Sequence, residues 1–408
     1  MTEFHYRCSR CSRTYGRDEV RYLCPVCGRD YRPGMPLVGV LEAEFDYICI
    51  ARDFRRDKPD WDLFSAVERE YFPAYPAGNT PFSPAPRLGE RLGRPGLWIK
   101  NDGLNPSGSL KDRASLLVVA EAARLGEKTI VCASTGNAAS SLAAVCAAAG
   151  RRAVIFVPRS APRAKLVQML ICGARVIPVR GSYDDAFRLS LEYTQRRGGL
   201  NRNTAYHPLT IEGKKTAGLE IFAQNGMLIP DAILVPVGDG VIISGIFKAF
   251  YDLRAAGLCD RLPRLVAVQA ESSAAIHDYI VSGTFRPAAS PATIADSISV
   301  SVPSNPDLAR RAVLESGGFS VTVSDERIME AQALLATEAG VFAEPAAAAA
   351  AAALLTDEVR ERLHPDWQIV LLVTGHGLKD VEAALSRLRI PDAIEPDLAA
   401  VPEEPAEG

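Results

Sequence analysis

The stretch NPSGSLKDR at residues 105–113 places one lysine, Lys111, between a predicted strand and a predicted helix. The strand is the apolar run at 97–99, and the helix at 112–125 ends beside Gly126. A lysine at such a turn is usually a solvated residue at the start of a helix. Its position alone therefore assigns it no chemistry, and the pattern around it has to decide what it does.

Strands and helices alternate on both sides of this segment. Helical stretches at 138–149 and 163–172 each end beside a glycine. Short apolar runs, typical of buried parallel strands, lie at 97–99, 129–133, 153–157, 175–179, 232–237, 264–268 and 368–373. This alternation predicts an α/β fold, and so many strands fit two doubly wound domains better than one.

Composition and charge narrow the function classes. Hydrophobic residues make up 48% of the 408 residues and charged residues 23%, which is too apolar for a disordered chain. The 46 basic and 49 acidic residues give a net charge of −3, so charge offers no argument for a nucleic-acid or anionic membrane partner. No apolar run is long enough to cross a bilayer, and the N-terminus lacks the layout of a signal peptide. Because five of the nine cysteines are scattered in apolar contexts, we expect a reducing, cytoplasmic location.

The other four cysteines form two pairs near the N-terminus. Cys8-x-x-Cys11 and Cys24-x-x-Cys27 are separated by 12 residues. Each pair directs two thiolates to the same side, and four thiolates complete the tetrahedral shell of one Zn²⁺. A complete shell predicts a structural metal site, in a zinc ribbon spanning residues 1–35. Two redox or disulfide pairs are the alternative, which a reducing compartment disfavours.

Three further loops each follow a predicted strand. STGN at 134–137 and GDGVI at 238–242 both open a helix, where free N–H groups can hold a carboxylate or a phosphate. TGHG at 374–377 follows the last predicted strand. Taken alone, GDG is a weak glycine-rich motif that lacks the lysine of a P-loop. The order of all four segments along the chain is more informative than any one of them.

Together the four segments resemble the pyridoxal-phosphate enzymes of the tryptophan synthase β/threonine synthase superfamily, fold type II. The resemblance covers about residues 80–388 and implies two domains around a cofactor cleft. It implies that Lys111 forms the Schiff base with pyridoxal 5′-phosphate, that Asn137 bonds the phenolic oxygen and that Thr374 faces the pyridine nitrogen. The cofactor's phosphate would be held by the backbone amides of Gly238, Asp239, Gly240, Val241 and Ile242.

Within the superfamily the nearest resemblance is to the threonine synthases, which convert O-phosphohomoserine and water to threonine and phosphate. It rests on the zinc ribbon and on GSYDDAFR at 181–188, IEGKKT at 211–216 and TGHGLKD at 374–380. The resemblance implies elimination or replacement at an amino acid, with Lys111 as the catalytic residue that moves the α-proton. The substrate would be held by Ser134, Thr135, Gly136 and Arg188, of which Ser134 and Arg188 would contact its phosphate.

Several residues depart from the threonine synthase pattern. The family's NPxRIEG becomes HPLTIEG at 207–213, with the loss of an asparagine and an arginine, and Ser182 replaces an asparagine. Arginine binds phosphate through charge-assisted hydrogen bonds, so its loss weakens that contact. The alternatives are a threonine/serine dehydratase-type deaminating lyase and a β-replacement enzyme for another β-substituted amino acid.

An interpretation from a different class is a zinc-ribbon binding protein with an inactive α/β body. The ribbon carries seven arginines, at positions 7, 10, 13, 17, 21, 29 and 32, and zinc ribbons can bind nucleic acid. The presence of Lys111, Asn137 and Thr374 together favours the enzyme. Because superfamily relatives are commonly dimers, we expect a homodimer.

The predicted organisation has four parts. Residues 1–35 form the ribbon, 36–80 connect it to the body, and 81–390 form the catalytic body. The resemblance implies a smaller, mobile domain at roughly 115–215 inserted into that body. Residues 391–408 are rich in Pro, Ala and Glu and are expected to form a disordered tail.

Overall fold

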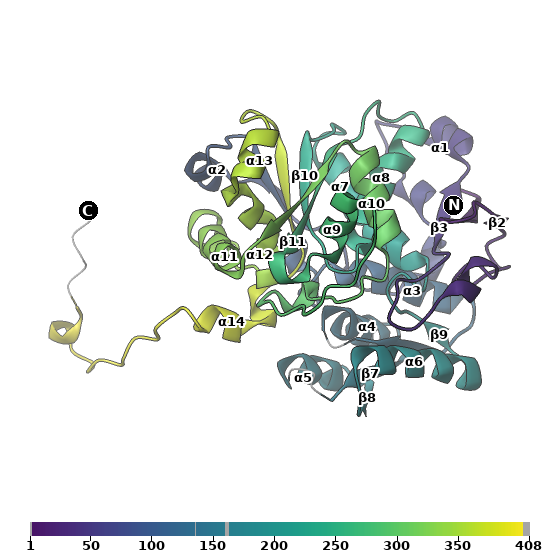
Figure 1. Ribbon diagram of the computed structural model, residues 1–408, viewed down its shortest axis with the longest axis horizontal. Helices are drawn as coiled ribbons and strands as arrows, with labels where there is room; N and C mark the ends of the chain where they lie inside the picture. The colour runs from purple at the N-terminus through teal and green to yellow at the C-terminus, as the bar shows by residue number, and fades with distance from the viewer. Residues whose placement is uncertain (1, 135, 160–162, 403–408) are drawn as a thin grey trace.

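The computed structural model describes residues 2–134, 136–159 and 163–402, and it contains three sheets. Two are the expected parallel sheets of an α/β fold, and the third is a small antiparallel sheet near the N-terminus (Figure 1). The α/β prediction with two doubly wound units is therefore confirmed. Each of the seven predicted strands lies in one of the two parallel sheets.

The larger sheet has the strand order β12-β11-β10-β13-β5-β4 and is parallel except where β4 pairs with β5. Alternate side chains of its strands enter different cores: Ile233 and Val235 face one, and Leu234 faces the other. Its strands are β4 (Phe82–Pro84), β5 (Leu97–Asn101), β10 (Ala232–Pro236), β11 (Arg264–Ala270), β12 (Phe319–Val323) and β13 (Ile369–Val373). Burial on both faces explains why β10 and β13 read as continuous apolar runs.

Helices cover both faces of the larger sheet. On one side lie α2 (Pro86–Leu92), α11 (Asp325–Ala339), α12 (Pro345–Ala352) and α13 (Asp357–Arg362). On the other side lie α7 (Leu209–Gln224), α8 (Val241–Ala255), α9 (Ala275–Ser282) and α10 (Pro306–Glu315). All eight residues of the alanine-rich α12 are buried, as expected for a close-packed core helix.

The smaller sheet is entirely parallel, with the order β8-β7-β6-β9. Its strands are β6 (Thr129–Ala133), β7 (Arg152–Pro158), β8 (Arg175–Val179) and β9 (Leu200–Asn201). It packs with α3 (Lys111–Arg124), α4 (Asn137–Ala148), α5 (Arg163–Ile171) and α6 (Tyr183–Arg197), which lie low in Figure 1. Gly213 allows α7 to approach α3 closely, since a Cβ there would lie 2.6 Å from the Cα of Ala114.

The N-terminal sheet extends beyond the predicted ribbon boundary at residue 35. Its strand order is β2-β1-β3, formed by β1 (Phe4–Cys8), β2 (Thr14–Tyr15) and β3 (Leu41–Phe45). After β3 come α1 (Tyr47–Asp53) and short 3₁₀ turns before the body begins. The module is fixed to the body by ion pairs, among which are Arg17–Glu68, Arg21–Glu127 and Arg124–Asp18.

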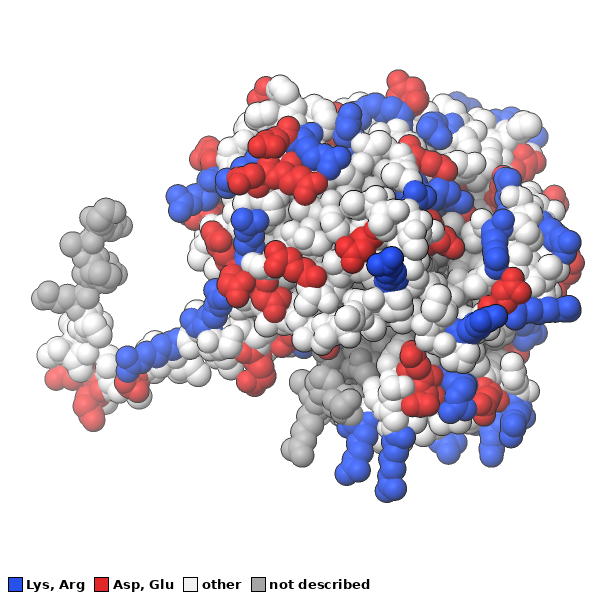
Figure 2. All heavy atoms as spheres, in the orientation of Figure 1, with Lys and Arg blue, Asp and Glu red and all other residues white. Residues whose placement is uncertain are grey.

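The C-terminal segment leaves the body after the short helix α14 (Val381–Leu385) and runs outward as an extended chain (Figure 1). Figure 2 shows basic and acidic side chains interspersed over the visible face, which agrees with the net charge of −3. Within the described part of the chain, no helix has the combination of length and apolar character that a membrane span requires.

Candidate active site

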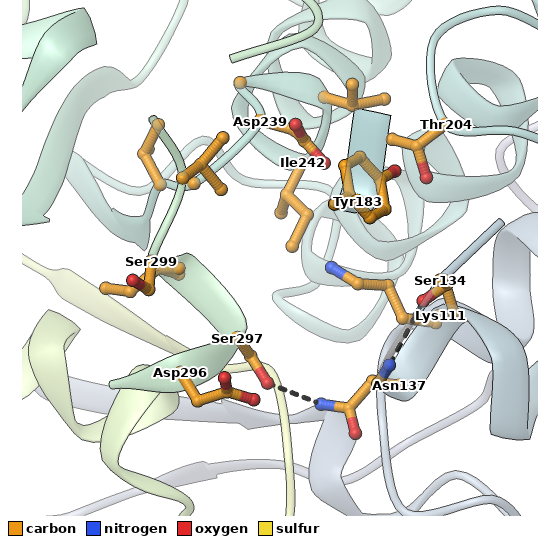
Figure 3. Close-up of a pocket in the computed structure, with 18 of the residues that line it drawn as sticks. Lys111, Ser134, Asn137, Tyr183, Thr204, Asp239, Ile242, Asp296, Ser297 and Ser299 are labelled. Atoms are coloured by element: carbon orange, nitrogen blue, oxygen red, sulfur yellow. Dashed lines mark hydrogen bonds between the residues drawn. The ribbon is translucent and has the colours of Figure 1, made fainter. Parts of the chain in front are cut away.

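A cavity of about 370 Å³ lies between the two parallel sheets, at the carboxyl ends of β6 and β10. It brings together segments far apart in the sequence, and Figure 3 shows their side chains converging on the Lys111 ammonium. The carboxyl ends of parallel strands, where helices begin, are the usual location of ligand sites in α/β folds. Of the predicted site residues, those lining the cavity are Lys111, Ser134, Gly136, Asn137, Gly238, Asp239, Gly240, Val241 and Ile242.

Lys111 is the first residue of α3 and points into the cavity between Asn137 and Ile242 (Figure 3). Burial lowers the pKa of its ammonium, while the carboxylates of Asp239 and Glu344 oppose that shift and Arg202 adds to it. Within the described residues its amine has no hydrogen bond or ion pair. A lysine with a lowered pKa and no partner offers a larger share of neutral, nucleophilic amine.

Asn137, the first residue of α4, is held by the carboxylate of Glu344, the residue that precedes α12. Its amide nitrogen contacts both carboxylate oxygens of Glu344, at 2.9 and 3.0 Å, and Ser297 Oγ at 3.3 Å. The amide oxygen Oδ1 is buried, with no hydrogen-bond partner among the described residues. Gly375 leaves room for this arrangement, because a Cβ at that position would overlap the Glu344 carboxylate.

The loop 238–242 ends β10 and opens the 15-residue helix α8. Within the part of the chain described, no acceptor is recorded for the N–H groups of its five residues. Gly240 has a φ of +83°, and a Cβ there would lie 2.6 Å from the carbonyl oxygen of Asn305, so only glycine fits. Free N–H groups at the positive end of a helix form an anion site.

Asp239 does not cap α8. Its Oδ1 accepts a hydrogen bond from the backbone N–H of Ser304 at 3.3 Å, and its carbonyl oxygen accepts one from Asn305. The residue also lines the cavity. It therefore places a negative charge beside a loop whose backbone favours anions.

The remaining predicted residues lie outside the cavity lining or outside the described residues. Thr374 is buried at the end of β13, and its carbonyl oxygen accepts the N–H of Leu110, next to Lys111. Arg188 is more than half exposed on α6, where it pairs with Glu192 at 2.7 Å and Asp185 at 3.6 Å. Thr135 lies outside the described residues. The individual roles of Thr374, Thr135 and Arg188 stay predictions.

Two features at and beside the cavity are not predicted by the sequence pattern. The first is the segment 297–302, which forms one side of the cavity although it matches none of the four motifs. The second is Glu344, which precedes α12 and contacts Asn137, 207 residues earlier in the chain. The alternation of serines with apolar residues between 297 and 301 is the one signal in the sequence that points to this wall.

The four paired cysteines form a second candidate site, in the N-terminal module. One sulfur from each of Cys8, Cys11, Cys24 and Cys27 lies within 4.8 Å of the others. Burial raises the pKa of the Cys24 thiol, but hydrogen bonds from the Cys27 N–H and the Tyr15 hydroxyl outweigh it and bring the pKa to about 6. Four converging sulfurs with one easily ionised thiol fit a tetrahedral thiophilic metal ion.

Residues 74–375 match the family described as "Pyridoxal-phosphate dependent enzyme". The chain belongs to that family. As a member of the pyridoxal-phosphate dependent enzymes, it is 34% identical to the threonine synthase of Methanosarcina acetivorans over 98% of either chain. It is 35% identical to the threonine synthase of Methanocaldococcus jannaschii, over 96% of this chain and 97% of that one. This pyridoxal-phosphate dependent enzyme is therefore a lyase of the threonine synthase-like type.

Solved structures support the same fold for this pyridoxal-phosphate dependent enzyme. A maize serine racemase superposes with a TM-score of 0.66 at 24% identity, covering 76% of this chain and 91% of that one. A threonine deaminase from T.th. superposes with a TM-score of 0.61 at 27% identity, covering 72% of this chain and 93% of that one. These likenesses confirm the expected fold type II architecture.

The cavity of this pyridoxal-phosphate dependent enzyme fits the cofactor on three observations. The five N–H groups of residues 238–242 lack acceptors among the described residues, as a phosphate site requires. Lys111 presents an unpartnered amine at the centre of the cavity (Figure 3). Asn137 has a buried Oδ1 without a partner in the described part of the chain, and its amide is oriented by Glu344.

Proposed function

We propose that the chain catalyses elimination or replacement at the β or γ carbon of an amino acid in this cavity, with threonine formation from O-phosphohomoserine and water as the first candidate. The observation that carries the proposal is the unpartnered amine of Lys111, opposite Asn137 and the anion-binding loop. When bound, pyridoxal phosphate withdraws electrons from the α-carbon of the amino acid. Full-length similarity to two threonine synthases supports this candidate.

The chain's own residues would supply orientation and proton transfer. Lys111 Nζ, with its pKa lowered by burial, can accept the α-proton and return one. Gly136 and Ser134, at the end of β6, would hold the substrate's carboxylate beside that nitrogen, and proximity of this kind lowers the barrier substantially. The segment 297–302, opposite α4, would limit access of water to the reacting atoms.

A second candidate is deamination or β-replacement of another β-substituted amino acid. Residues at the departures from the threonine synthase pattern have other partners here: the Thr210 hydroxyl bonds the His207 carbonyl and the Ala205 N–H, and Ser182 caps α6. Arg188 is paired on the surface of α6. These positions therefore offer a substrate phosphate few charge-assisted donors.

A substrate panel separates the two candidates. The holoenzyme would be given O-phosphohomoserine, serine, threonine or O-phosphoserine, with released phosphate, ammonia and keto acid measured. Phosphate release with threonine formation supports the first candidate, and ammonia from serine or threonine supports deamination. Activity should disappear in Lys111→Ala, and borohydride reduction should attach the cofactor to the peptide containing Lys111. Attachment at another lysine would refute the proposed role of Lys111.

The proposal also includes a structural Zn²⁺ on the four clustered cysteines, a homodimer and a cytoplasmic location. The sulfur cluster supports the metal, and the burial of Cys132 and Cys146 in the apolar core agrees with reduced thiols. The dimer rests on the resemblance alone, and light scattering after size exclusion would test it. Against a nucleic-acid role for the ribbon, Arg7, Arg10, Arg17 and Arg21 are paired with carboxylates.

A further inference from the structure

Lys214 is a buried lysine that lines the same cavity. It lies on α7 and is 1% exposed. Within residues 2–134, 136–159 and 163–402 its ammonium has no hydrogen bond or ion pair. Its neighbour Lys215 is equally buried but pairs with Glu212 at 2.5 Å and Asp252 at 3.0 Å. Because a buried ammonium is costly without a counter-charge, the contrast indicates that Lys214 meets its partner in the cavity.

Lys214 packs against α8, the helix that begins in the anion-binding loop 238–242. Gly245, in the second turn of α8, faces it so closely that a Cβ on the glycine would lie 2.9 Å from the Lys214 Cβ. The loop 238–242 at the start of the same helix has N–H groups without acceptors among the described residues. A cationic side chain and a positive helix end therefore meet on one side of the cavity.

Charges around Lys214 are mostly positive. Lys111 and Arg202 act on it as cations, and Asp239 is the carboxylate that opposes them. The Oδ1 of Asp239 already accepts the N–H of Ser304. Arg202, 1% exposed, donates to Thr204, but its Nη2 has no acceptor in the described part of the chain. The surroundings of Lys214 thus contain more donors and more positive charge than the protein itself satisfies, although Arg202 does not line the cavity.

We propose that Lys214 is a phosphate-binding residue of the cavity and that its ammonium pairs with a phosphate group of a ligand. The phosphate belongs either to the cofactor or to an amino-acid substrate, and the second source rests on the proposed function. The IEGKKT segment at 211–216 resembles IEGQKT of the threonine synthases, in which glutamine stands at the position of Lys214. Lysine adds a full charge to a site otherwise built from amides, so it favours a dianion. Burial lowers the pKa of Lys214 well below its ordinary value, with Lys111 and Arg202 acting in the same direction, and a bound dianion would reverse that shift.

The test compares Lys214→Gln, the amide of the resembling motif, with Lys214→Met and with the exposed-surface control Lys58→Gln. Cofactor-free protein is titrated with pyridoxal phosphate, with pyridoxal and with inorganic phosphate, and dissociation constants are measured by absorbance and calorimetry. If the phosphate is the cofactor's, both Lys214 variants bind pyridoxal phosphate and inorganic phosphate about tenfold or more weakly, while pyridoxal binding is unchanged. These titrations need no turnover, so they remain informative if the proposed reaction is wrong.

If the phosphate is the substrate's, pyridoxal phosphate binds the variants normally. The holoenzyme variants then bind inorganic phosphate about tenfold more weakly, and the KM for a phosphorylated amino acid rises while that for serine is unchanged. The proposal is overturned if phosphate and pyridoxal phosphate bind all variants equally and KM values are unaltered. It is also overturned if pyridoxal and pyridoxal phosphate weaken to the same extent. Equal far-ultraviolet circular dichroism and thermal midpoints without ligand verify that the variants fold.

Discussion

At the scale of single residues, Asn137 links the two halves of the cavity. Its amide nitrogen, on α4 beside the smaller sheet, contacts both oxygens of Glu344, which precedes α12 under the larger sheet. An asparagine can donate to a carboxylate while its oxygen stays available, and an aspartate cannot donate when ionised. The contact with Glu344 therefore favours asparagine at position 137 as much as any ligand does.

This contact predicts the order of two substitutions at position 137. Asn137→Ala removes the donated hydrogen bonds and should weaken pyridoxal-phosphate binding by about tenfold. Asn137→Asp places a second carboxylate against Glu344, and repulsion between the two should weaken binding further although the side chains are nearly isosteric. Absorbance titration of cofactor-free protein measures both effects. Equal or stronger binding by the aspartate variant would contradict the inferred role of Glu344.

Glycine 240 gives a second prediction at this scale. Gly240→Ala has to accommodate a φ of +83° and a Cβ 2.6 Å from the Asn305 carbonyl oxygen, so the loop must shift. Gly257→Ala is the matched control, with a φ of +67° and no atom within 4 Å of the new Cβ. Cofactor affinity should fall strongly in the first variant and remain unchanged in the second, which loses only about 1 kcal/mol of stability. Similar cofactor affinities in the two variants would count against the loop as the phosphate site.

At the scale of elements, a buried ionic network fixes the start of α3 and therefore Lys111. Arg113, 3% exposed, pairs with Asp102 at 2.6 Å and with Glu220 of α7 at 2.7 Å. Lys100 of β5 reaches the same Glu220 at 2.6 Å. Loss of one member of such a network typically costs about 3–5 kcal/mol because the others stay buried without a partner. The network thus joins β5, α3 and α7 around Lys111.

The same network predicts a pH dependence of stability. Burial opposes ionisation of Glu220, but Arg113 and Lys100 outweigh it and lower the pKa of the carboxyl from 4.5 to about 2. Its contribution is therefore complete above pH 4.5 and is lost as the pH falls from 4.5 towards 2. That pKa difference corresponds to about 3 kcal/mol of unfolding free energy.

Urea unfolding at a series of pH values tests this assignment. In Glu220→Gln the acid-side fall of the unfolding free energy should be smaller than in the parent by up to about 3 kcal/mol. Glu358→Gln, which removes an exposed carboxylate paired with Arg362, should leave the profile unchanged. Identical pH profiles for Glu220→Gln and the parent would show that Glu220 is not the titrating group.

At the scale of the whole molecule, the N-terminal module rests on segments that also form the site. Tyr22 stacks on Tyr206 with ring centroids 4.5 Å apart, and its hydroxyl accepts the N–H of Asn201 at 3.0 Å. Thr204, which lies between Asn201 and Tyr206, lines the cavity. The module and the cavity therefore share one stretch of backbone.

Removal of the proposed metal should consequently affect more than the module. Without the metal, four sulfurs within 4.8 Å of one another lose the ion that they share. We therefore expect the thermal midpoint of unfolding to fall by several degrees on chelation. Elemental analysis should find one zinc per chain in the parent and none in Cys24→Ser, whereas Cys259→Ser should keep it. A stoichiometric absence of metal from purified, untreated protein would contradict the site.

The parts of the fold that depend on local sequence pattern could be predicted from the sequence alone. Buried parallel strands and glycine-terminated helices are local, and the order of the four motifs indicated the family. The contacts of Asn137 with Glu344, 207 residues later, and of Lys214 with α8 depend on how the sheets are assembled, which no local pattern contains. Strand β3 was not predicted although LEAEF alternates apolar and acidic residues, and its pairing with β1, more than 30 residues earlier, is the part that no local pattern contains.

Helix α12 has a consequence at the level of the gene. Its residues after Pro345 are alanines, all of them buried between the larger sheet and α11. Each alanine codon becomes a valine codon through one nucleotide transition, and every such change would add two methyl groups to a fully buried layer. The alanine run of α12 is a low-complexity sequence, yet we expect its codons to be among those that tolerate the fewest substitutions in this gene.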